Sequence, residues 1–228
     1  MIRLITIAGP PSSGKTSVII KMLESSPTLK TVSGVIKFDC ISSLDEQQYE
    51  KNGIMAKTGL AGNLCPDHYF VSNIDACFKW ATENNFTTLI TESAGLCNRC
   101  APHLKGVTAV CVLDNLSGIN TPLKTGPMLK FADVVVVTKS DLVSQAEREV
   151  FRFKIQQVNP RCSVLNVNGI TGQGADKLAA IVLKSTAIEN ADNLKLRFAM
   201  PAALCSYCLG ETRVGEDFQI GLNRKIKL

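Results

Sequence analysis

The chain has few histidine and aromatic residues and no long apolar segment. Of its 228 residues, two are histidine, one is tryptophan and 6% are aromatic. No segment reaches the roughly 18 apolar residues that a membrane-spanning helix needs, so we expect no membrane association. Lysine and arginine are scattered, and a net charge of +5 without a basic run argues against a nucleic-acid partner. The first residues lack the layout of a signal peptide, and we therefore expect a cytoplasmic location.

Cysteine, in contrast, is abundant. Reducing compartments disfavour structural disulfides, so nine cysteines in a cytosolic chain indicate metal or redox chemistry where they cluster. Four cysteines stand singly in apolar or mixed segments, and we expect them to be small buried side chains: Cys40, Cys77, Cys111 and Cys162. The other five are grouped and are candidate ligands: Cys65, Cys97, Cys100, Cys205 and Cys208.

Apolar runs with strand character alternate with helical patterns over most of the chain. Strands are predicted at 4–8, 32–38, 87–91, 107–113, 133–138 and 163–167, and helices at 72–84, 121–131, 144–157 and 174–186. This alternation predicts an α/β fold with a mostly parallel sheet flanked by helices. Ligands of such sheets bind at the carboxyl ends of the strands.

The alternation ends at about residue 188. Residues 188–193 have the composition of a polar linker, and short strand-like pieces follow at 194–199 and 212–220. We therefore predict one nucleotide-binding domain, residues 1–187, and a short C-terminal appendage, residues 188–228, which carries Cys205 and Cys208 and is a candidate metal-binding segment.

A phosphate-binding motif follows the first predicted strand. Residues 9–16 read Gly-Pro-Pro-Ser-Ser-Gly-Lys-Thr, which matches G-x-x-x-x-G-K-[ST] between a strand and a helix and predicts a P-loop NTPase. Main-chain N–H groups of such a loop bind phosphates, Lys15 is expected to reach the outer phosphates, and the Thr16 hydroxyl to bind Mg²⁺. The predicted phosphate-contacting set is Gly9, Pro10, Ser12, Ser13, Gly14, Lys15, Thr16 and Ser17.

Two later segments favour guanine as the base. Thr138-Lys139-Ser140-Asp141 ends a valine-rich strand, and its aspartate can accept hydrogen bonds from guanine N1–H and the exocyclic amine, while the Lys139 stem stacks on the base. Adenine lacks this pair of donors, so the Asp141 carboxylate would have no hydrogen-bond partner if ATP occupied the site. The loop that starts at Asn168-Gly169 follows the last predicted strand, where a base-contacting loop is expected. Asp141 as a simple helix N-cap is the alternative.

Acidic residues at two strand ends are candidates for organising the magnesium ion. Glu92 closes the strand predicted at 87–91 and would hold the Mg²⁺ water shell. Asp39 follows the strand predicted at 32–38 and is the candidate second acid, near Mg²⁺ or the attacking water, with Asp45 as a weaker substitute and a surface turn as the alternative role. The predicted catalytic residues are therefore Lys15, Asp39 and Glu92.

Taken together, the motifs resemble a known family. The set comprises G-P-x-x-S-G-K-T at 9–16, E-S-x-G at 92–95, T-K-S-D at 138–141 and T-G-x-G at 171–174. Over residues 1–186 it is similar to the metallochaperone GTPases that mature nickel enzymes and cobalamin, the HypB, UreG and CobW group of the SIMIBI class. The resemblance implies a slow Mg²⁺-dependent GTPase that forms a homodimer and delivers a metal to an apo-metalloenzyme client or another maturation factor.

The same resemblance implies three metal ligands. Thr58-Gly59 and then Cys65-Pro66-Asp67-His68 are similar to the T-G-G-C-P-H of UreG-like proteins, with two inserted stretches. Glu92 to Cys97 is similar to the E-S-V-G-N-L-V-C of HypB-like proteins, with the cysteine two residues early. By this resemblance Cys65, His68 and Cys97 would bind metal across a dimer that GTP closes.

The chain also departs from the family pattern. Cys100 and His103 follow Cys97, the C-x-x-C of Cys205 and Cys208 has no counterpart in the pattern, and there is no His-rich nickel-storage tract. Arg99 could stabilise the neighbouring thiolates or touch a phosphate across a dimer. Two C-x-x-C turns can supply four thiolates to Zn²⁺ or to a [4Fe–4S] cluster, whereas nickel accepts mixed cysteine and histidine ligation. The spacing leaves open whether the two pairs meet within one chain or across a dimer.

Three functions follow from these observations. The first is a GTP-hydrolysing metallochaperone or metallocofactor-maturation factor that carries Zn²⁺ or Ni²⁺ at a cysteine-rich site coupled to the nucleotide. The second is a nucleotide-dependent protein that binds a [4Fe–4S] cluster for redox chemistry or delivery. The third is a GTP-gated adaptor whose C-terminal appendage binds zinc only for docking.

Overall fold

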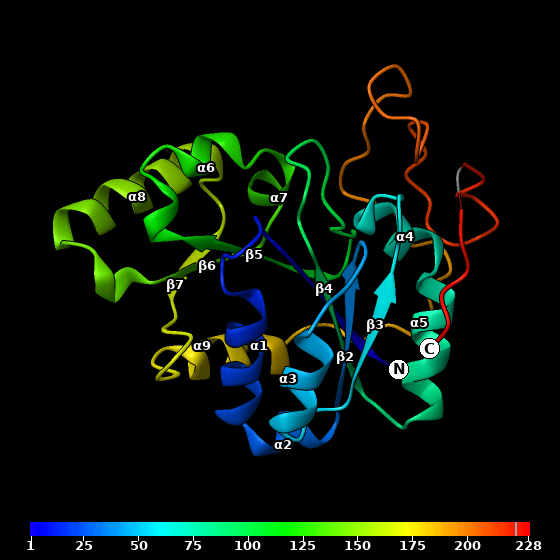
Figure 1. The fold of residues 1–228 in the computed structure, drawn as a ribbon, viewed down its shortest axis with the longest axis horizontal. Coiled ribbons are helices and arrows are strands. Elements are labelled where there is room, and N and C mark those ends of the chain that lie inside the picture. The colour runs from blue at the N-terminus through cyan, green and yellow to red at the C-terminus, as the bar shows by residue number, and fades with distance from the viewer. Residues whose placement is uncertain (222) are drawn as a thin grey trace.

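The computed structural model describes residues 1–221 and 223–228, and in this part of the chain seven parallel strands form one sheet (Figure 1). Their order is β3-β2-β4-β1-β5-β6-β7. The predicted parallel sheet flanked by helices is therefore confirmed. The strands are β1 (Arg3–Ala8), β2 (Ser33–Asp39), β3 (Ala56–Leu60), β4 (Thr88–Ser93), β5 (Thr108–Asp114), β6 (Val134–Thr138) and β7 (Ser163–Asn166).

Helices cover both faces of the sheet because its strands carry apolar side chains on both sides. One face packs against α1 (Lys15–Glu24), α2 (Pro27–Thr31), α3 (Asp45–Lys51) and α9 (Ala175–Leu183). The other face packs against α4 (Pro66–Ser72), α5 (Ile74–Glu83), α7 (Pro127–Lys130) and α8 (Gln145–Val158), and α6 (Thr121–Lys124) lies beside α8. Neighbouring residues of β1 divide between the faces, with Leu4 in one core and Ile5 in the other.

All strand pairs are parallel, so their carboxyl ends meet at one edge of the sheet. Central strand β1 leads into the 9–16 loop, β4 ends at Glu92 and Ser93, β5 ends at Asp114, and β6 leads into Lys139. This edge is where ligands bind in sheets of this type. The fold thus brings the predicted nucleotide motifs together.

Several elements differ from the sequence prediction. The helix predicted at 72–84 is confirmed as α5, but the separate helix α4 before it was not predicted. The helix predicted at 121–131 is two helices, α6 and α7, separated by Gly126 at φ +64°. Strand β3 and helices α2 and α3 were not predicted. Cys77 and Cys111 are buried as expected, but the expectation is wrong for Cys40 and Cys162, which are only partly buried.

The C-terminal residues contain no strand in the described part of the chain, so the strands predicted at 194–199 and 212–220 are wrong. Only isolated bridges join Leu196 to Leu104 and Lys195 to Arg213. The expected polar linker also packs on the sheet domain, since Ile188 pairs with Ile2 and Ala191 is buried. The segment then runs along α4 and α5, as the orange and red ribbon of Figure 1 shows. The boundary between residues 187 and 188 stays a prediction.

Among the described helices, none has the length and apolarity required for a membrane span.

Candidate functional site

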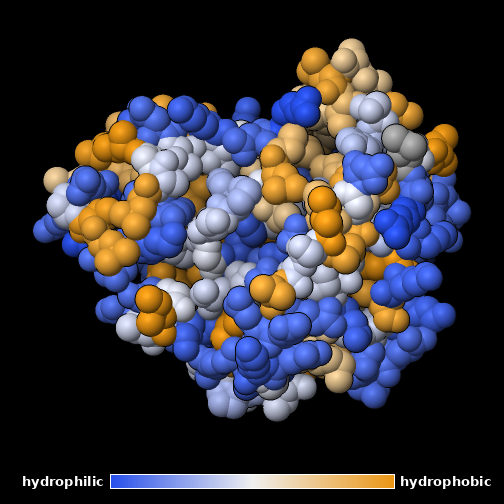
Figure 2. Space-filling view, in the orientation of Figure 1, coloured by the Kyte–Doolittle hydropathy of each residue, from blue (hydrophilic) through white to orange (hydrophobic). Residues whose placement is uncertain are grey.

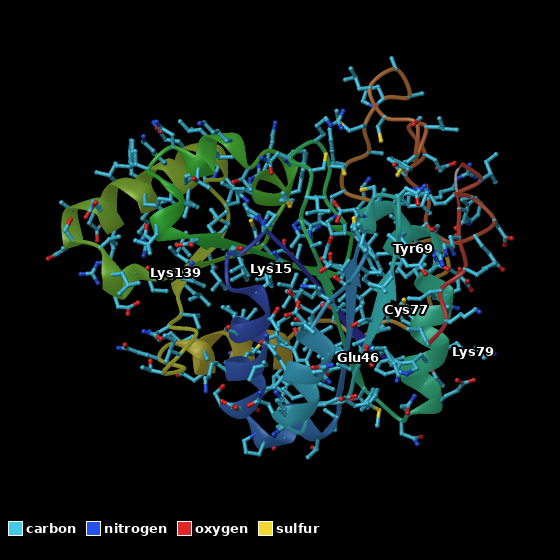
Figure 3. The ribbon with its side chains drawn as sticks, in the orientation of Figure 1. Lys15, Glu46, Tyr69, Cys77, Lys79 and Lys139 are labelled. Carbon is cyan, nitrogen blue, oxygen red and sulfur yellow. The ribbon has the colours of Figure 1, made fainter. Side chains whose placement is uncertain are left out.

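The phosphate-binding loop connects β1 to the first turn of α1 and borders a cavity of about 390 Å³. The Lys15 ammonium group donates hydrogen bonds to the carbonyl oxygens of Gly9 at 2.9 Å and Pro10 at 2.8 Å. Burial lowers the pKa of Lys15 to about 8, although Glu92 opposes this shift. Figure 3 shows Lys15 near the strand ends, with Lys139 in the direction of α8.

Two features of the loop fit a bound phosphate chain. Within the described residues, the buried Ser13 hydroxyl has no hydrogen-bond partner, which leaves a donor for a ligand. A Cβ atom at Gly9 would lie 2.1 Å from the Val112 carbonyl oxygen, so this position accepts only glycine. Gly14, Thr16 and Ser17 also line the cavity.

Glu92 is fully buried at the end of β4 and is the centre of a polar network. Its Oε1 accepts hydrogen bonds from the Thr16 hydroxyl at 2.9 Å and from the Lys37 ammonium at 2.6 Å, and its Oε2 accepts one from the Tyr49 hydroxyl at 2.7 Å. Lys37 also pairs with Asp45 at 2.7 Å. A hydroxyl beside a carboxylate is a donor set that suits Mg²⁺, so the residues fit the ion predicted here.

Charge and burial fix the protonation states around Glu92. Burial acts to lower the pKa of Lys37, but Glu92 and Asp45 outweigh it, so the pKa is raised and the ammonium stays charged. Burial, together with the neighbouring Glu92 charge, raises the pKa of Tyr49, which stays a hydrogen-bond donor. Asp39 lines the same cavity and accepts a hydrogen bond from the Cys40 N–H at 2.8 Å. Sequence reasoning missed Lys37 and Tyr49, which belong to no recognised motif.

The predicted base-contacting residues lie on the other side of the loop. Thr138 donates to the Ser13 carbonyl at 2.8 Å, which fixes the end of β6 against the phosphate-binding loop. Lys139, with a left-handed φ of +56°, forms an ion pair with Asp114, a residue that sequence reasoning also missed. Asp141 is exposed and lines a cavity of about 560 Å³ together with Asn168.

The loop that begins at Asn168 is held by its own polar contacts. The Asn168 carboxamide oxygen accepts hydrogen bonds from the main-chain N–H groups of Ile170 at 2.8 Å and Thr171 at 2.9 Å. Gly169 lies against α1, since a Cβ there would be 3.0 Å from the Ser17 Cβ.

A second group of candidate residues surrounds a small cavity beside α4. The ligand atoms of Cys65, Asp67 and Cys100 lie within 4.8 Å of one another. Cys205 and Cys208 line the same cavity, and a ring nitrogen of His68 is 3.3 Å from the Cys208 sulfur. We call this group the sulfur pocket: Cys65, Asp67, His68, Cys100, Cys205 and Cys208. The structure thus brings both C-x-x-C segments together within one chain.

Hydrogen bonding distinguishes the thiols of the sulfur pocket. The Cys100 thiol lies 3.6 Å from an Asp67 oxygen. A hydrogen bond from Cys100 lowers the pKa of Cys65, and the same bond, together with burial, raises the pKa of Cys100. Burial raises the pKa of Cys208 to about 12 and also raises the pKa of Asp67. Metal binding here would therefore release protons.

The end of β4 lies between the two sites. Ser93, the neighbour of Glu92, donates a hydrogen bond to Asp67 of the sulfur pocket. A Cβ at Gly95 would lie 1.8 Å from the Gly9 carbonyl oxygen, so the segment after β4 is in direct contact with the phosphate-binding loop. The segment of four consecutive residues, 92–95, thus contacts both sites, the phosphate-binding loop through Gly95 and the sulfur pocket through Ser93.

Three predicted or considered residues lie outside the sulfur pocket. Cys97 does not line it, and its sulfur accepts hydrogen bonds from the Arg99 main-chain N–H at 3.3 Å and the Arg99 side chain at 3.4 Å. Both ring nitrogens of the buried His103 are hydrogen-bonded at 3.0 Å, one to the Thr6 hydroxyl and the other to the Met128 carbonyl. His103 is therefore a structural residue.

Comparison with protein families gives one match over most of the chain. The model of the CobW/HypB/UreG nucleotide-binding domain matches residues 3–166. That range includes the phosphate-binding loop, Glu92 and Lys139, and it ends before Cys205 and Cys208.

Similar proteins and structures agree with this match. An uncharacterised protein of Methanocaldococcus jannaschii is 43% identical over 220 residues, which cover 96% of this chain and 94% of that protein. The hydrogenase maturation factor HypB of Rhizobium leguminosarum bv. viciae is 29% identical over 174 residues, 75% of this chain and 57% of that protein. The structure of HypB from Helicobacter pylori in complex with nickel has a TM-score of 0.64 at 18% identity, covering 80% of this chain and 86% of that one, which shows a common fold.

Proposed function

The chain belongs to the CobW/HypB/UreG nucleotide-binding family, and on this premise we propose that it is a Mg²⁺-dependent GTPase that serves as a metallochaperone or metallocofactor-maturation factor. We further propose that the sulfur pocket carries the cargo metal, that turnover is slow without a partner, and that the protein acts in the cytoplasm. A homodimer and an apo-metalloenzyme client, or another maturation factor, complete the proposal.

The nucleotide chemistry assigned to the chain is hydrolysis of the γ-phosphate by water. The Lys15 ammonium neutralises phosphate charge, and the loop N–H groups orient the phosphates. Thr16 and Glu92 would hold Mg²⁺, which supplies Lewis-acid charge stabilisation when bound. Asp39 lines the cavity, and we assign to it the orientation of the attacking water.

Guanine selectivity is assigned to Asp141, with Lys139 against the base and the loop at Asn168 and Gly169 beside it. The Asp141→Asn variant should bind GTP at least about tenfold more weakly and gain affinity for xanthosine triphosphate. The new amide NH2 group would face the exocyclic amine of guanine, donor to donor, but it can donate to the 2-oxo oxygen of xanthine. Competition binding with GTP, ATP and xanthosine triphosphate measures this change. An unaltered base preference would contradict guanine reading by Asp141.

The observation that carries the proposal is the link between the two sites. The Thr16 hydroxyl binds Glu92, and the adjacent Ser93 binds Asp67 in the sulfur pocket. A change at the nucleotide can therefore reach the cargo through two neighbouring residues of one strand, which provides a physical basis for coupled binding.

A second candidate cargo is a [4Fe–4S] cluster, because four thiols line one cavity. Elemental analysis and absorption spectra of oxygen-free protein, with a non-hydrolysable GTP analogue or with GDP, test both candidates. Stoichiometric zinc or nickel that responds to the nucleotide supports the metallochaperone, whereas a brown protein with bound iron and sulfide supports the cluster. Protein that hydrolyses GTP but holds no metal in either nucleotide state would refute the metallochaperone proposal.

A further inference from the structure

We infer that the C-terminal loop, residues 200–211, completes the cargo site within a single chain, so that one thiophilic metal ion is held in cis by sulfur atoms from three separate segments. This inference rests on the proposed function and specifies its ligand set and its cargo. It assigns a role to Cys205 and Cys208, which lie outside the range matched by the family model.

The first argument is the position of the thiols. Cys65 directly precedes the first residue of α4, and Cys100 follows β4. Their sulfur atoms lie within 4.8 Å of each other. Cys205 and Cys208, on the C-terminal loop, line the same cavity as Cys65 and Cys100. Four thiols of one chain therefore surround one space, without a symmetry-related copy.

The second argument is that the C-terminal loop is seated on α4 by specific contacts. The His68 ring lies 3.3 Å from the Cys208 sulfur and packs on the Tyr207 ring, with centroids 5.6 Å apart. The Tyr207 hydroxyl donates to the Asn63 carbonyl at 3.0 Å. These contacts hold Tyr207 and Cys208 against Asn63 and His68, which lie on either side of Cys65 in the sequence.

The third argument is that both ends of the C-terminal loop are anchored to the sheet domain. Before the loop, Leu196 is buried and Arg197 binds Asp133 at 2.7 Å. After it, Val214 is buried and the Asn73 side chain binds the main chain of Ile226 at 2.9 Å. The two anchors restrict the loop to the neighbourhood of α4, which favours closure within the chain over exchange with a second copy.

The chemistry and size of the sulfur pocket define the cargo. Thiolates select soft or borderline ions such as Zn²⁺ and Cu⁺. The cavity volume is about 20 Å³, close to the space of one water molecule, which suits a single ion. A cubane cluster would require the C-terminal loop to move away from α4. Figure 2 shows apolar residues where the C-terminal loop protrudes above the sheet domain.

Metal titration of the full-length chain under reducing, oxygen-free conditions tests the inference. Zn²⁺ serves for affinity, and Co²⁺ serves to count thiolates by their charge-transfer absorbance. We expect one ion per chain, with an affinity independent of protein concentration. The Cys205→Ser/Cys208→Ser variant should lose affinity by at least about a hundredfold and lose the absorbance of two thiolates, since removal of supporting groups alone costs 10–100-fold.

The matched control is Cys40→Ser/Cys162→Ser, which also removes two partly buried thiols, both outside the sulfur pocket. It should bind Zn²⁺ like the wild type, and urea unfolding of both variants verifies that the sheet domain is folded. One ion per two chains, full affinity in Cys205→Ser/Cys208→Ser, or iron and sulfide bound as a cluster would each overturn the inference. GTP turnover in the same preparations separates this failure from failure of the proposed function.

Discussion

A single buried carboxylate, Glu92, organises the polar residues of the nucleotide site. Its side chain is completely buried and receives hydrogen bonds from Thr16, Lys37 and Tyr49. A buried carboxylate without such partners is costly, and these three donors satisfy both Glu92 oxygens beside the proposed Mg²⁺ ligand Thr16. Lys37 supplies the only full positive charge among them and is the residue whose removal is most informative.

Substitution Lys37→Met should leave the Glu92 charge buried without its counter-ion. Because one partner of a buried pair is lost, we expect the free energy of unfolding at pH 7 to fall by about 3–5 kcal/mol. Urea unfolding monitored by circular dichroism measures this loss.

The partly exposed pair of Lys57 and Glu46, 3.6 Å apart, provides the control. Substitution Lys57→Met should change the free energy of unfolding by less than about 1 kcal/mol, because surface ion pairs contribute little. Equal effects of the two substitutions would show that burial of the Lys37 pair has no energetic consequence.

The buried His103 should make the free energy of unfolding depend on pH. Burial lowers its pKa from 6.5 to about 4, so the folded state resists protonation more than the unfolded state does. This contribution to stability is fully present above pH 6.5 and is lost as the pH falls towards 4, with a total loss of roughly 3 kcal/mol. The slope of the unfolding free energy against pH should flatten over this window in His103→Gln. A slope that is identical in the variant would rule out this role.

The candidate site could be predicted from the sequence only where its functional residues are neighbours in the sequence and form a motif. The phosphate-binding loop and the Thr138 to Asp141 segment are local motifs and were recognised. Asp67 and Lys37 are single polar residues in a helix and a strand, and their roles depend on Ser93 and Glu92, which are distant in the sequence. Local spacing likewise could not decide where Cys205 and Cys208 lie.

Among the elements, the C-terminal segment is attached to the sheet domain by the side chain of Arg197. Arg197 donates hydrogen bonds to the carbonyl oxygens of Leu104 at 2.8 Å and Val107 at 2.7 Å, and it pairs with Asp133 at 2.7 Å. These partners lie before β5 and β6, so one guanidinium group connects the segment to two loops of the sheet domain. This explains how the segment is fixed although it contains no strand among the described residues.

Substitution Arg197→Met should release the segment from the sheet domain. The lost charged hydrogen bonds predict a fall of about 3 kcal/mol in the free energy of unfolding and faster hydrogen exchange at the Leu196 amide, which is bound to the Thr212 carbonyl. Arg213→Met is the control, because Arg213 pairs with Glu211 inside the same segment. Protection of the Leu196 amide at wild-type level in Arg197→Met would contradict the anchor.

The elements that the sequence predicted correctly are those with strong apolar patterns. Strand β6 is a run of valines and was recognised, whereas β3 reads Ala-Lys-Thr-Gly-Leu at the sheet edge and has no such pattern. Residues 194–199 and 212–220 have β-branched and aromatic residues in short runs, but they pack individually against α4 and α5 without pairing in a ladder. Side-chain pattern alone does not separate these two outcomes.

At the scale of the whole molecule, the nucleotide cavity and the sulfur pocket lie at one edge of the sheet, and the end of β4 separates them. The contacts of Glu92 with Thr16 and of Ser93 with Asp67 form a continuous connection between the sites through two adjacent residues. If binding at one site changes affinity at the other, the second site must change the first by the same factor. Such reciprocity can be measured from either side.

Substitution Ser93→Ala tests this connection directly. In the wild type we expect the Zn²⁺ affinity to differ by on the order of tenfold between a non-hydrolysable GTP analogue and GDP. Loss of the Ser93 hydroxyl should reduce that ratio below about twofold while both nucleotides and Zn²⁺ still bind, because Ser93 contacts neither ligand in the proposed arrangement. The control is Ser72→Ala. Ser72 is a buried serine on α4 whose hydroxyl donates to the Tyr69 carbonyl, so this variant should keep the wild-type ratio. Isothermal titration with each nucleotide, and with Zn²⁺ in the reverse order, gives both sides of the cycle; an undiminished ratio in Ser93→Ala would exclude the Ser93–Asp67 contact as the route of coupling.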